Sequence, residues 1–265
     1  MADSIAVIVG VGPGLGWALI RRFSRAGMQV VGASRAPHKL KSNLVDENLP
    51  NTHLLSCDAS TESDVANLFK RVEKDFGKPD LVIFNAGAYE PGQVLAIRPQ
   101  DFERCWRVGC FAGLLVGQAA SKLMLPLGAG TIIFTGASAS LRGSAGFANL
   151  AVAKFGLRAL AQCMARELGP KGIHVALVVI DGQVGAEHSR DLLSERRPDS
   201  LLSPDAIAEA YHDLHRQHRS AWTHELDLRP WVERFGASGA DIREKSSRFT
   251  GRPRSNSSVS VADSR

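Results

Sequence analysis

The chain has 265 residues, of which 44% are hydrophobic, so it can bury the core of one large α/β domain. Its net charge of +5 suits an acidic small ligand but is too small to indicate a nucleic-acid partner. We expect no membrane partner, because no apolar run approaches the roughly 18 residues of a membrane span. The N-terminus lacks the features of a signal peptide, so we expect a cytoplasmic protein. Its four scattered cysteines should then be reduced.

Short apolar strands alternate with amphipathic helices along most of the chain. In chain order we predict a strand at 4–9, a helix at 14–26, a strand at 29–34, a helix at 36–47, a strand at 52–56, a helix at 61–76, a strand at 80–84, a helix at 99–125, a strand at 131–135, a helix at 144–168, a strand at 173–180, a helix at 204–218 and a strand at 223–228. This alternation predicts an α/β Rossmann fold, a doubly wound parallel sheet in a three-layer α/β/α arrangement.

The last thirty residues differ from the rest of the chain. We predict one dinucleotide-binding domain over residues 1–235, followed by a basic, Ser/Arg-rich tail over residues 236–265 that lacks apolar periodicity. Such a composition is typical of a disordered segment. A basic tail can contact nucleic acid or an anionic membrane, but a solvated tail is the more common case, so we assign it no partner.

A glycine-rich turn joins the first predicted strand to the first predicted helix. It contains Gly10, Gly12, Gly14, Leu15 and Gly16. Glycines at this position let the backbone approach a pyrophosphate, and the positive end of the helix favours its negative charge. A tight turn without a ligand would also use glycines, but the strand–turn–helix context favours a dinucleotide site.

The end of the second predicted strand indicates which dinucleotide is bound. An acidic residue there would accept hydrogen bonds from a ribose hydroxyl and favour NAD, but the strand ends at Ser34 and is followed by Arg35. The guanidinium of Arg35 offers a fork of donors that suits a 2′-phosphate. We therefore favour NADP(H) over NAD(H); the alternative is that Arg35 is a solvated surface residue.

Several motifs in order resemble those of the short-chain dehydrogenase/reductase family, from about residue 4 to residue 228. They are the GxxxGxG turn, Cys57-Asp58, Asn85-Ala86-Gly87, the segment 136–154, and Ile180-Asp181-Gly182. The resemblance implies that Asp58 binds the adenine amino group, although a helix-entry cap explains this residue equally well. It further implies that Asn85, Ala86, Gly87, Lys154, Gly182 and Val184 line the cofactor. A homodimer or homotetramer is also implied, built through the two long helices.

The residues that carry proton transfer in the family are largely missing. The family tyrosine falls on Leu150, its serine on Ala137 and its asparagine on Gly109, whereas Lys154 is kept. Leucine cannot move a proton. Ser138 is the best remaining contact for a substrate carbonyl, with a simple turn serine as the alternative.

Two tyrosines and three histidines are further candidates. Tyr89 follows a strand at the edge where ligands bind, but a phenol packed on its loop is the simpler reading; Tyr211 lies on a late helix. His212, His215 and His218 recur every three residues, and an exposed polar face explains them better than a metal site does, so we expect no metal.

We therefore expect a divergent NADP(H)-dependent oxidoreductase that acts on a small-molecule carbonyl or alcohol, with Ser138 and Lys154 as its catalytic residues. Its proton donor is unassigned. The alternative is a catalytically silent dinucleotide-binding protein that acts as a sensor or regulatory partner.

Overall fold

Seven parallel strands form one sheet in the computed structural model, which describes residues 4–185 and 199–232. The strands are β1 (Ile5–Val9), β2 (Gln29–Ser34), β3 (Thr52–Ser56), β4 (Leu81–Phe84), β5 (Gly130–Thr135), β6 (Ile173–Ile180) and β7 (Glu225–Leu228). Their order is β3-β2-β1-β4-β5-β6-β7, so the chain reverses its direction of winding between β1 and β4. The predicted doubly wound Rossmann sheet is confirmed, and such a reversal is where these folds bind ligands.

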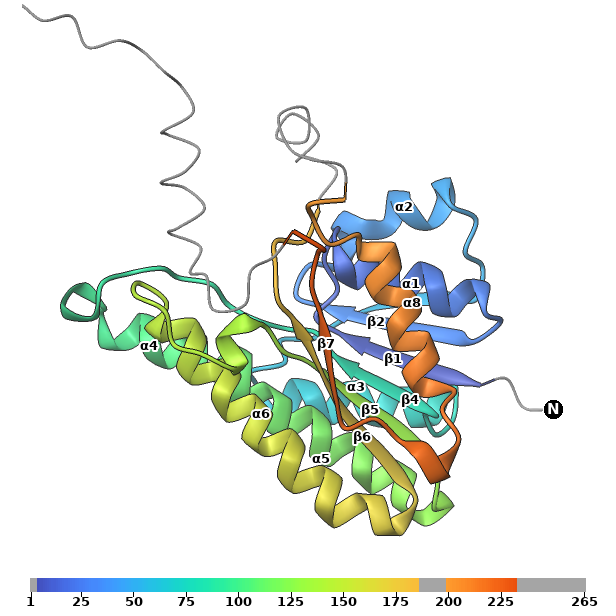
Figure 1. Ribbon diagram of the computed structural model, residues 1–265. Coiled ribbons are helices and arrows are strands. Elements are labelled where there is room, and N and C mark those ends of the chain that lie inside the picture. The colour runs from blue at the N-terminus through green and yellow to red at the C-terminus, as the bar shows by residue number, and fades with distance from the viewer. Residues whose placement is uncertain (1–3, 186–198, 233–265) are drawn as a thin grey trace, which may run out of the picture. The chain divides into compact units, whose positions relative to one another are not determined.

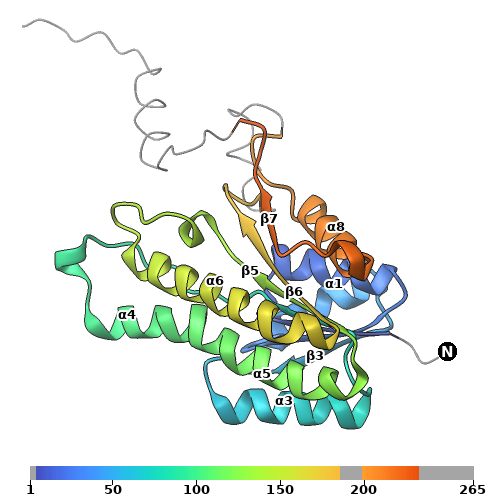
Figure 2. The same cartoon turned by 60° about the horizontal axis from the view of Figure 1, so that its bottom comes forward.

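Helices cover both faces of the sheet (Figure 1 and Figure 2). On one face lie α1 (Leu15–Arg25), α2 (Lys41–Asp46) and α8 (Pro204–His215), where Trp17, Phe23 and Tyr211 belong to one apolar cluster. On the other face lie α3 (Glu62–Asp75), α5 (Ala112–Met124) and α6 (Ala148–Leu168), whose cluster includes Leu68 and Leu157. The three-layer prediction is therefore confirmed as well.

The long helix predicted before β5 contains one irregular turn. It consists of α4 (Pro99–Trp106), a π-helical turn at Arg107–Phe111, and α5. By length and composition the stretch Pro99–Leu127 could cross a membrane, but half of its most apolar window is buried inside the fold. A buried core helix meets the same criterion, and α5 contacts both α3 and α6.

Several predicted boundaries were wrong for local reasons. The helix predicted at 144–168 begins at Ala148, because Gly146 has a positive φ of 81° and Phe147 bridges to Gly92. The strand predicted from residue 223 begins at Glu225, because the Thr223 N–H donates to Gln217 instead (2.7 Å). The helix predicted at 36–47 splits into a 3-10 turn (Pro37–Leu40) and α2, and α8 ends three residues early, at His215. The tail at 236–265 lies outside the described residues.

Two histidines near the amino ends of β5 and β6, the buried His174 and the half-buried His215, should make the fold sensitive to acid. The His174 ring lies 2.8 Å from the Thr223 carbonyl and stacks on Trp222, and the His215 ring lies 3.0 Å from the Thr131 hydroxyl. Burial lowers the pKa of both imidazoles, and the nearby carboxylate of Asp80 only partly opposes this effect at His215. Below pH ~6.5 the unfolded chain therefore binds protons that the folded chain resists.

We expect the free energy of unfolding to be constant near neutral pH and to fall as the pH drops below about 6.5. Urea unfolding at pH 7.5, 6.5 and 5.5 measures this change. His215→Gln should reduce the slope, whereas His38→Gln, at an exposed position, should leave it unchanged. An equal acid sensitivity of all three proteins would contradict this assignment.

Candidate functional site

The glycine turn and the loop after β4 are packed against each other at the reversal between β1 and β4. Gly10 has a positive φ of 96°, and a Cβ at this position would lie 2.4 Å from the backbone nitrogen of Ala86. The Asn85 side chain donates a hydrogen bond to the Gly10 carbonyl (3.0 Å). No residue other than glycine fits at position 10, and Asn85 and Ala86 hold the turn in place.

The remaining glycines of the turn have different surroundings. A Cβ at Gly16 would lie 2.8 Å from the Val11 Cα, so packing explains this glycine. A Cβ at Gly12 or Gly14 would meet no atom within 4 Å. Next to this open space α1 begins at Leu15, with no acidic residue in its first turn and no side-chain cap. An anion can approach the backbone here and would meet the positive end of α1.

Arg35 and Asp58 lie close together beyond the ends of β2 and β3. Arg35 is exposed, and its charge contributes to lowering the pKa of Asp58. The largest cause of that lowering is the Ser60 hydroxyl, which donates to Asp58 Oδ1 (2.7 Å); the Ser60 N–H donates to the same oxygen (3.0 Å). Asp58 thus shapes the entry to α3, while Thr61 is the N-cap residue. One oxygen of Asp58 therefore has a local structural role.

Lys154 is a buried cation at the carboxyl edge of the sheet. Its Nζ donates to the carbonyl of Thr135, the last residue of β5, at 2.7 Å. A Cβ at Gly87, in the loop after β4, would lie 3.5 Å from the same Nζ. Burial lowers the pKa of the Lys154 ammonium to about 8, and the nearby Cys110 thiol opposes this shift. The ammonium therefore lies between the ends of β4 and β5, where burial favours its neutral form more than water does.

Two of the positions that match the missing family residues lie on segments that also hold Lys154 in place: its own helix α6 and the loop that follows β5. Leu150 lies one helical turn before it and is half-buried. The Ala137 N–H donates to the Ser140 hydroxyl (3.1 Å), so Ser140 supports the loop. Ser138 is half-buried, and its carbonyl accepts from Leu141 at 3.0 Å. Its role as a substrate contact stays a prediction.

Gly109 lies on the π-helical turn, pressed against α6. A Cβ at this position would come within 3.0 Å of the Cβ of Ala153. This close approach is a physical reason for glycine at the position where the family resemblance expects asparagine.

Neither tyrosine is placed as a clear proton donor. The Tyr211 hydroxyl lies 2.9 Å from that of Thr135 and is fully buried, and burial raises the pKa of its phenol well above the ordinary value. Tyr89 is 60% exposed and packs on the ring of Phe147, with 5.7 Å between ring centroids. Tyr89 therefore contacts a residue at the start of α6 rather than its own loop, and most of its side chain is exposed.

The segment after β6 is shaped by close packing. Gly182 has a positive φ of 159°, and a Cβ there would lie 2.7 Å from the Pro230 ring. Val184 forms a bridge with Leu202. The preceding Asp181 is 1% exposed and forms ion pairs with Arg142 and Arg229. Neither arginine was among the site residues predicted from the sequence.

The three spaced histidines do not converge on one point. His212 lies against Arg22 (2.8 Å), His215 against Thr131, and His218 against Ser220. The expectation of an exposed polar face was wrong for His212, which is 8% exposed. In the described part of the chain, Glu209, His212 and Asp213 are close enough to share a cation, but Arg22 pairs with Glu209 and His212.

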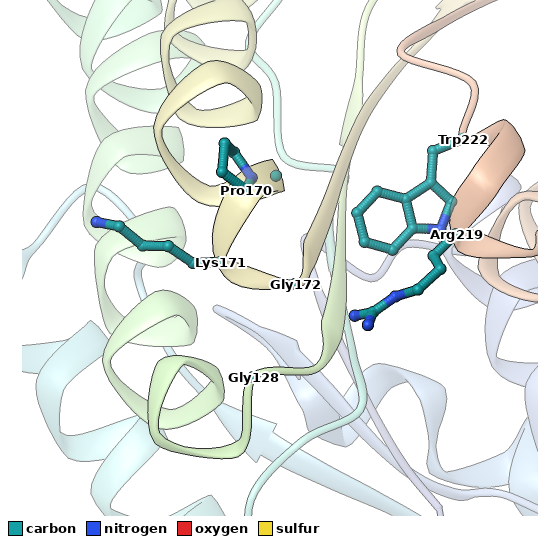
Figure 3. Close-up of a pocket in the computed structure, with 7 residues that line it drawn as sticks. Gly128, Pro170, Lys171, Gly172, Arg219 and Trp222 are labelled. Atoms are coloured by element: carbon teal, nitrogen blue, oxygen red, sulfur yellow. The ribbon is translucent and has the colours of Figure 1, made fainter.

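One hollow of about 370 Å³ lies away from this site (Figure 3). It is lined by Gly128, Gly169, Pro170, Lys171, Gly172, Arg219 and Trp222. Gly128 lies two residues before β5 and Gly172 directly precedes β6, so the hollow is at the amino edge of the sheet. Ligands of such folds bind at the carboxyl edge, so we do not assign this hollow to the candidate site.

Comparisons with known proteins agree with this geometry. The protein-family model described as "short chain dehydrogenase" matches residues 4–196 of this chain. A relative from Melia azedarach, "(21S)-21-acetoxyl-apo-melianone synthase SDR", is 32% identical over 180 residues, covering 67% of this chain and 66% of the relative, slightly less than two thirds of its length. A solved short-chain dehydrogenase from Rhodopseudomonas palustris has a TM-score of 0.74 and 35% identity, covering 86% of this chain and 99% of that structure. The structure "ElxO with NADP Bound", at 18% identity, has a TM-score of 0.78, covers 86% of this chain and 97% of its own, and supports the fold alone.

Proposed function

The chain belongs to the short-chain dehydrogenase family, and from this premise we propose that it is an NADP(H)-dependent oxidoreductase acting on a carbonyl or alcohol. The observation that carries the proposal is the open space beside Gly12 and Gly14 at the start of α1, where packing gives no reason for glycine. When bound, the nicotinamide would supply or accept the hydride. The substrate, like the activity of the whole protein, belongs to this proposal.

The residues present fit a phosphorylated dinucleotide. The backbone of the glycine turn would hold the pyrophosphate, and Arg35 would pair with a 2′-phosphate. The proposed cofactor-binding residues are Gly10, Gly12, Gly14, Leu15, Gly16, Arg35, Asp58, Asn85, Ala86, Gly87, Lys154, Gly182 and Val184. Asp58 keeps one oxygen engaged by Ser60, so only its second oxygen is offered to an adenine amino group.

We assign the role of proton donor to Lys154, because leucine occupies position 150 and the Tyr211 hydroxyl is buried. The ammonium, held by the Thr135 carbonyl, would give its proton to the alkoxide that forms on the substrate and regain one from water. In the oxidation direction the neutral amine would take the proton. Ser138 would orient the substrate oxygen. A positioned acid–base group contributes roughly 10²–10⁴ in rate.

The cofactor preference is tested at Arg35. We expect Arg35→Asp to weaken NADPH binding by roughly 100-fold or more and to leave NADH binding within a few-fold, because the substitution removes a charge-assisted fork and adds a repulsive carboxylate. Nucleotide fluorescence titration measures both affinities. Arg71→Asp, at an exposed position on α3, is the control and should change neither. Equal losses for both nucleotides would contradict the preference.

A second candidate function is a dinucleotide-binding sensor without turnover. It is favoured by the simultaneous presence of Leu150, Ala137 and Gly109 where the family has tyrosine, serine and asparagine. On this view the unchanged protein binds NADPH but reduces no member of a broad carbonyl panel. The double variant Leu150→Tyr, Ala137→Ser should then gain turnover without a change in NADPH affinity. Turnover by the unchanged protein rules this candidate out.

We also propose a cytoplasmic homodimer or homotetramer. The outer sides of α4 and α6 expose Trp106 (38%), Val152 (45%) and Phe155 (42%), which a second copy would cover. Sedimentation analysis of the unchanged protein and of Phe155→Glu measures the assembly state. A monomer in both cases would contradict the proposal.

A further inference from the structure

A chain of four charged side chains ties together three segments at the carboxyl edge of the sheet. Arg142 lies in the loop between β5 and α6, Asp181 directly follows β6, and Arg229 directly follows β7. Arg142 donates from Nη2 to Asp181 Oδ1 (3.0 Å) and from Nη1 to Asp181 Oδ2 (3.2 Å). The Arg229 guanidinium forms an ion pair with the same Oδ2 (3.2 Å). Arg229 also pairs with Asp227. The Asp181 side chain is only 2% exposed, so this carboxylate is fixed and shielded from water.

This ion pair lies on the face of the sheet that carries Lys154. Side chains alternate along β6, and Leu177 and Val179 belong to the same apolar cluster as Leu157 of α6. Asp181 continues that alternation, so it projects toward the α6 side. Its partner Arg142 lies four residues after Ser138, in the loop that leads to α6. The pair therefore lies on the same side of the sheet as α6, and the Arg142 N–H donates to the carbonyl of Ser138 (3.1 Å), the proposed substrate contact.

The geometry leaves one edge of the Arg142 guanidinium available. Asp181 occupies the end-on edge, through Nη1 and Nη2, while the side edge contains the Nε–H and an outward Nη–H. Among the described residues, Asp181 is the hydrogen-bond partner of this guanidinium, and the Arg142 side chain is 29% exposed. The single negative charge of Asp181 is shared between two arginines. Arg229 has a second partner, Asp227, but this carboxylate is 39% exposed and water screens its charge. Within residues 4–185 and 199–232, Arg142 thus keeps part of its positive charge and a donor fork that no other side chain occupies.

We infer that Arg142, oriented by Asp181, anchors a carboxylate on the substrate, so that the protein prefers carbonyl compounds with an acidic group over their neutral analogues. This inference rests on the proposed function, because it names the substrate class of the same site. A planar fork held in one orientation binds a carboxylate with two parallel hydrogen bonds and loses little side-chain entropy on binding. The buried carboxylate of Asp181 supplies that fixed orientation.

Three pairs of probes test the anchor: pyruvate, levulinate and 4-formylbenzoate, each against its methyl ester. Calorimetric titration with excess NADP⁺ measures binding without turnover. We expect the unchanged protein to bind at least one acid roughly 10- to 100-fold more tightly than its ester. Arg142→Gln should remove this preference. Arg142→Lys keeps the charge but lacks the second donor edge, so it should lose most of the preference even if the glutamine variant does not fold.

Arg158→Gln is the matched control. Arg158 is 30% exposed and pairs through two hydrogen bonds with Glu225, so it resembles Arg142 in exposure and pairing but borders no proposed ligand. Its loss should leave the acid preference unchanged. The anchor is overturned if the unchanged protein shows no acid preference in any pair, or if both Arg142 variants keep it. Acid-selective binding without reduction of any probe by NADPH would instead count against the proposed oxidoreductase activity alone.

Discussion

Replacing Gly14 with alanine is expected to weaken NADPH binding by at least about 10-fold and to leave the thermal unfolding midpoint within a few degrees of the unchanged protein. A Cβ at this position meets no protein atom within 4 Å, so the added methyl group can only obstruct a ligand that approaches the start of α1. Fluorescence titration with NADPH and a thermal melt measure the two quantities on the same sample.

Gly10→Ala is the matched contrast within the same turn. Here φ is +96° and the Cβ would lie 2.4 Å from the Ala86 nitrogen, so we expect a destabilisation of roughly 3 kcal/mol or more together with the loss of binding. The pair of variants separates a glycine required by packing from one required by a ligand. If Gly14→Ala binds NADPH as tightly as the unchanged protein does, the turn is not a dinucleotide site.

Lys154→Met is expected to reduce the rate of carbonyl reduction by roughly 10²–10⁴, because it removes the proposed proton donor while keeping the volume of the stem. The pKa of the Lys154 ammonium is about 8. Reduction by the unchanged protein should therefore slow as the pH rises through about 8, since the ammonium is lost, and alcohol oxidation should slow as the pH falls through the same value. Single-turnover rates between pH 6 and 10 measure both profiles.

Stability supplies a readout that does not depend on activity. The folded pKa of about 8 lies below the ordinary 10.5, so the unfolded chain binds the extra proton between these values. The free energy of unfolding should therefore rise with pH across that window, and Lys154→Met should abolish the rise and stabilise the protein at neutral pH. Lys154→Arg keeps a charge at all these pH values and should show a reduction rate without the break near pH 8. A break that persists in the methionine variant would contradict the assignment.

Structural features that depend on residues close together in the sequence could be predicted from it. Most of the strands follow from short apolar runs rich in β-branched residues, and the turn around Gly14 follows from glycine spacing between a strand and a helix. Asp58 was ambiguous because its bond to Ser60 is local, whereas any contact with a ligand is not. The predicted start of a helix was wrong where a loop distant in sequence contacts it. Gly92 forms a bridge with Phe147, and α6 begins only after that residue.

Features that join distant segments were not accessible in the same way. Arg142 and Asp181 are 39 residues apart, and nothing in the pattern around either residue indicates its partner. His212 and His215 were placed correctly on one helix, but periodicity alone does not say which side of α8 faces the sheet. The observed contacts with Arg22 and Thr131 settle that point in favour of the buried side.

The close approach of Gly109 to Ala153 constrains how this protein can change. An asparagine at position 109 would need room that the Ala153 methyl group occupies, 3.0 Å from the new Cβ. Gly109→Asn alone should therefore be destabilising, and Ala153→Gly should relieve it, so the two positions are epistatic. Restoring the family asparagine at position 109 by itself would therefore destabilise the protein at the π-helical turn. A variant that regains this asparagine would have to change position 109 and α6 together.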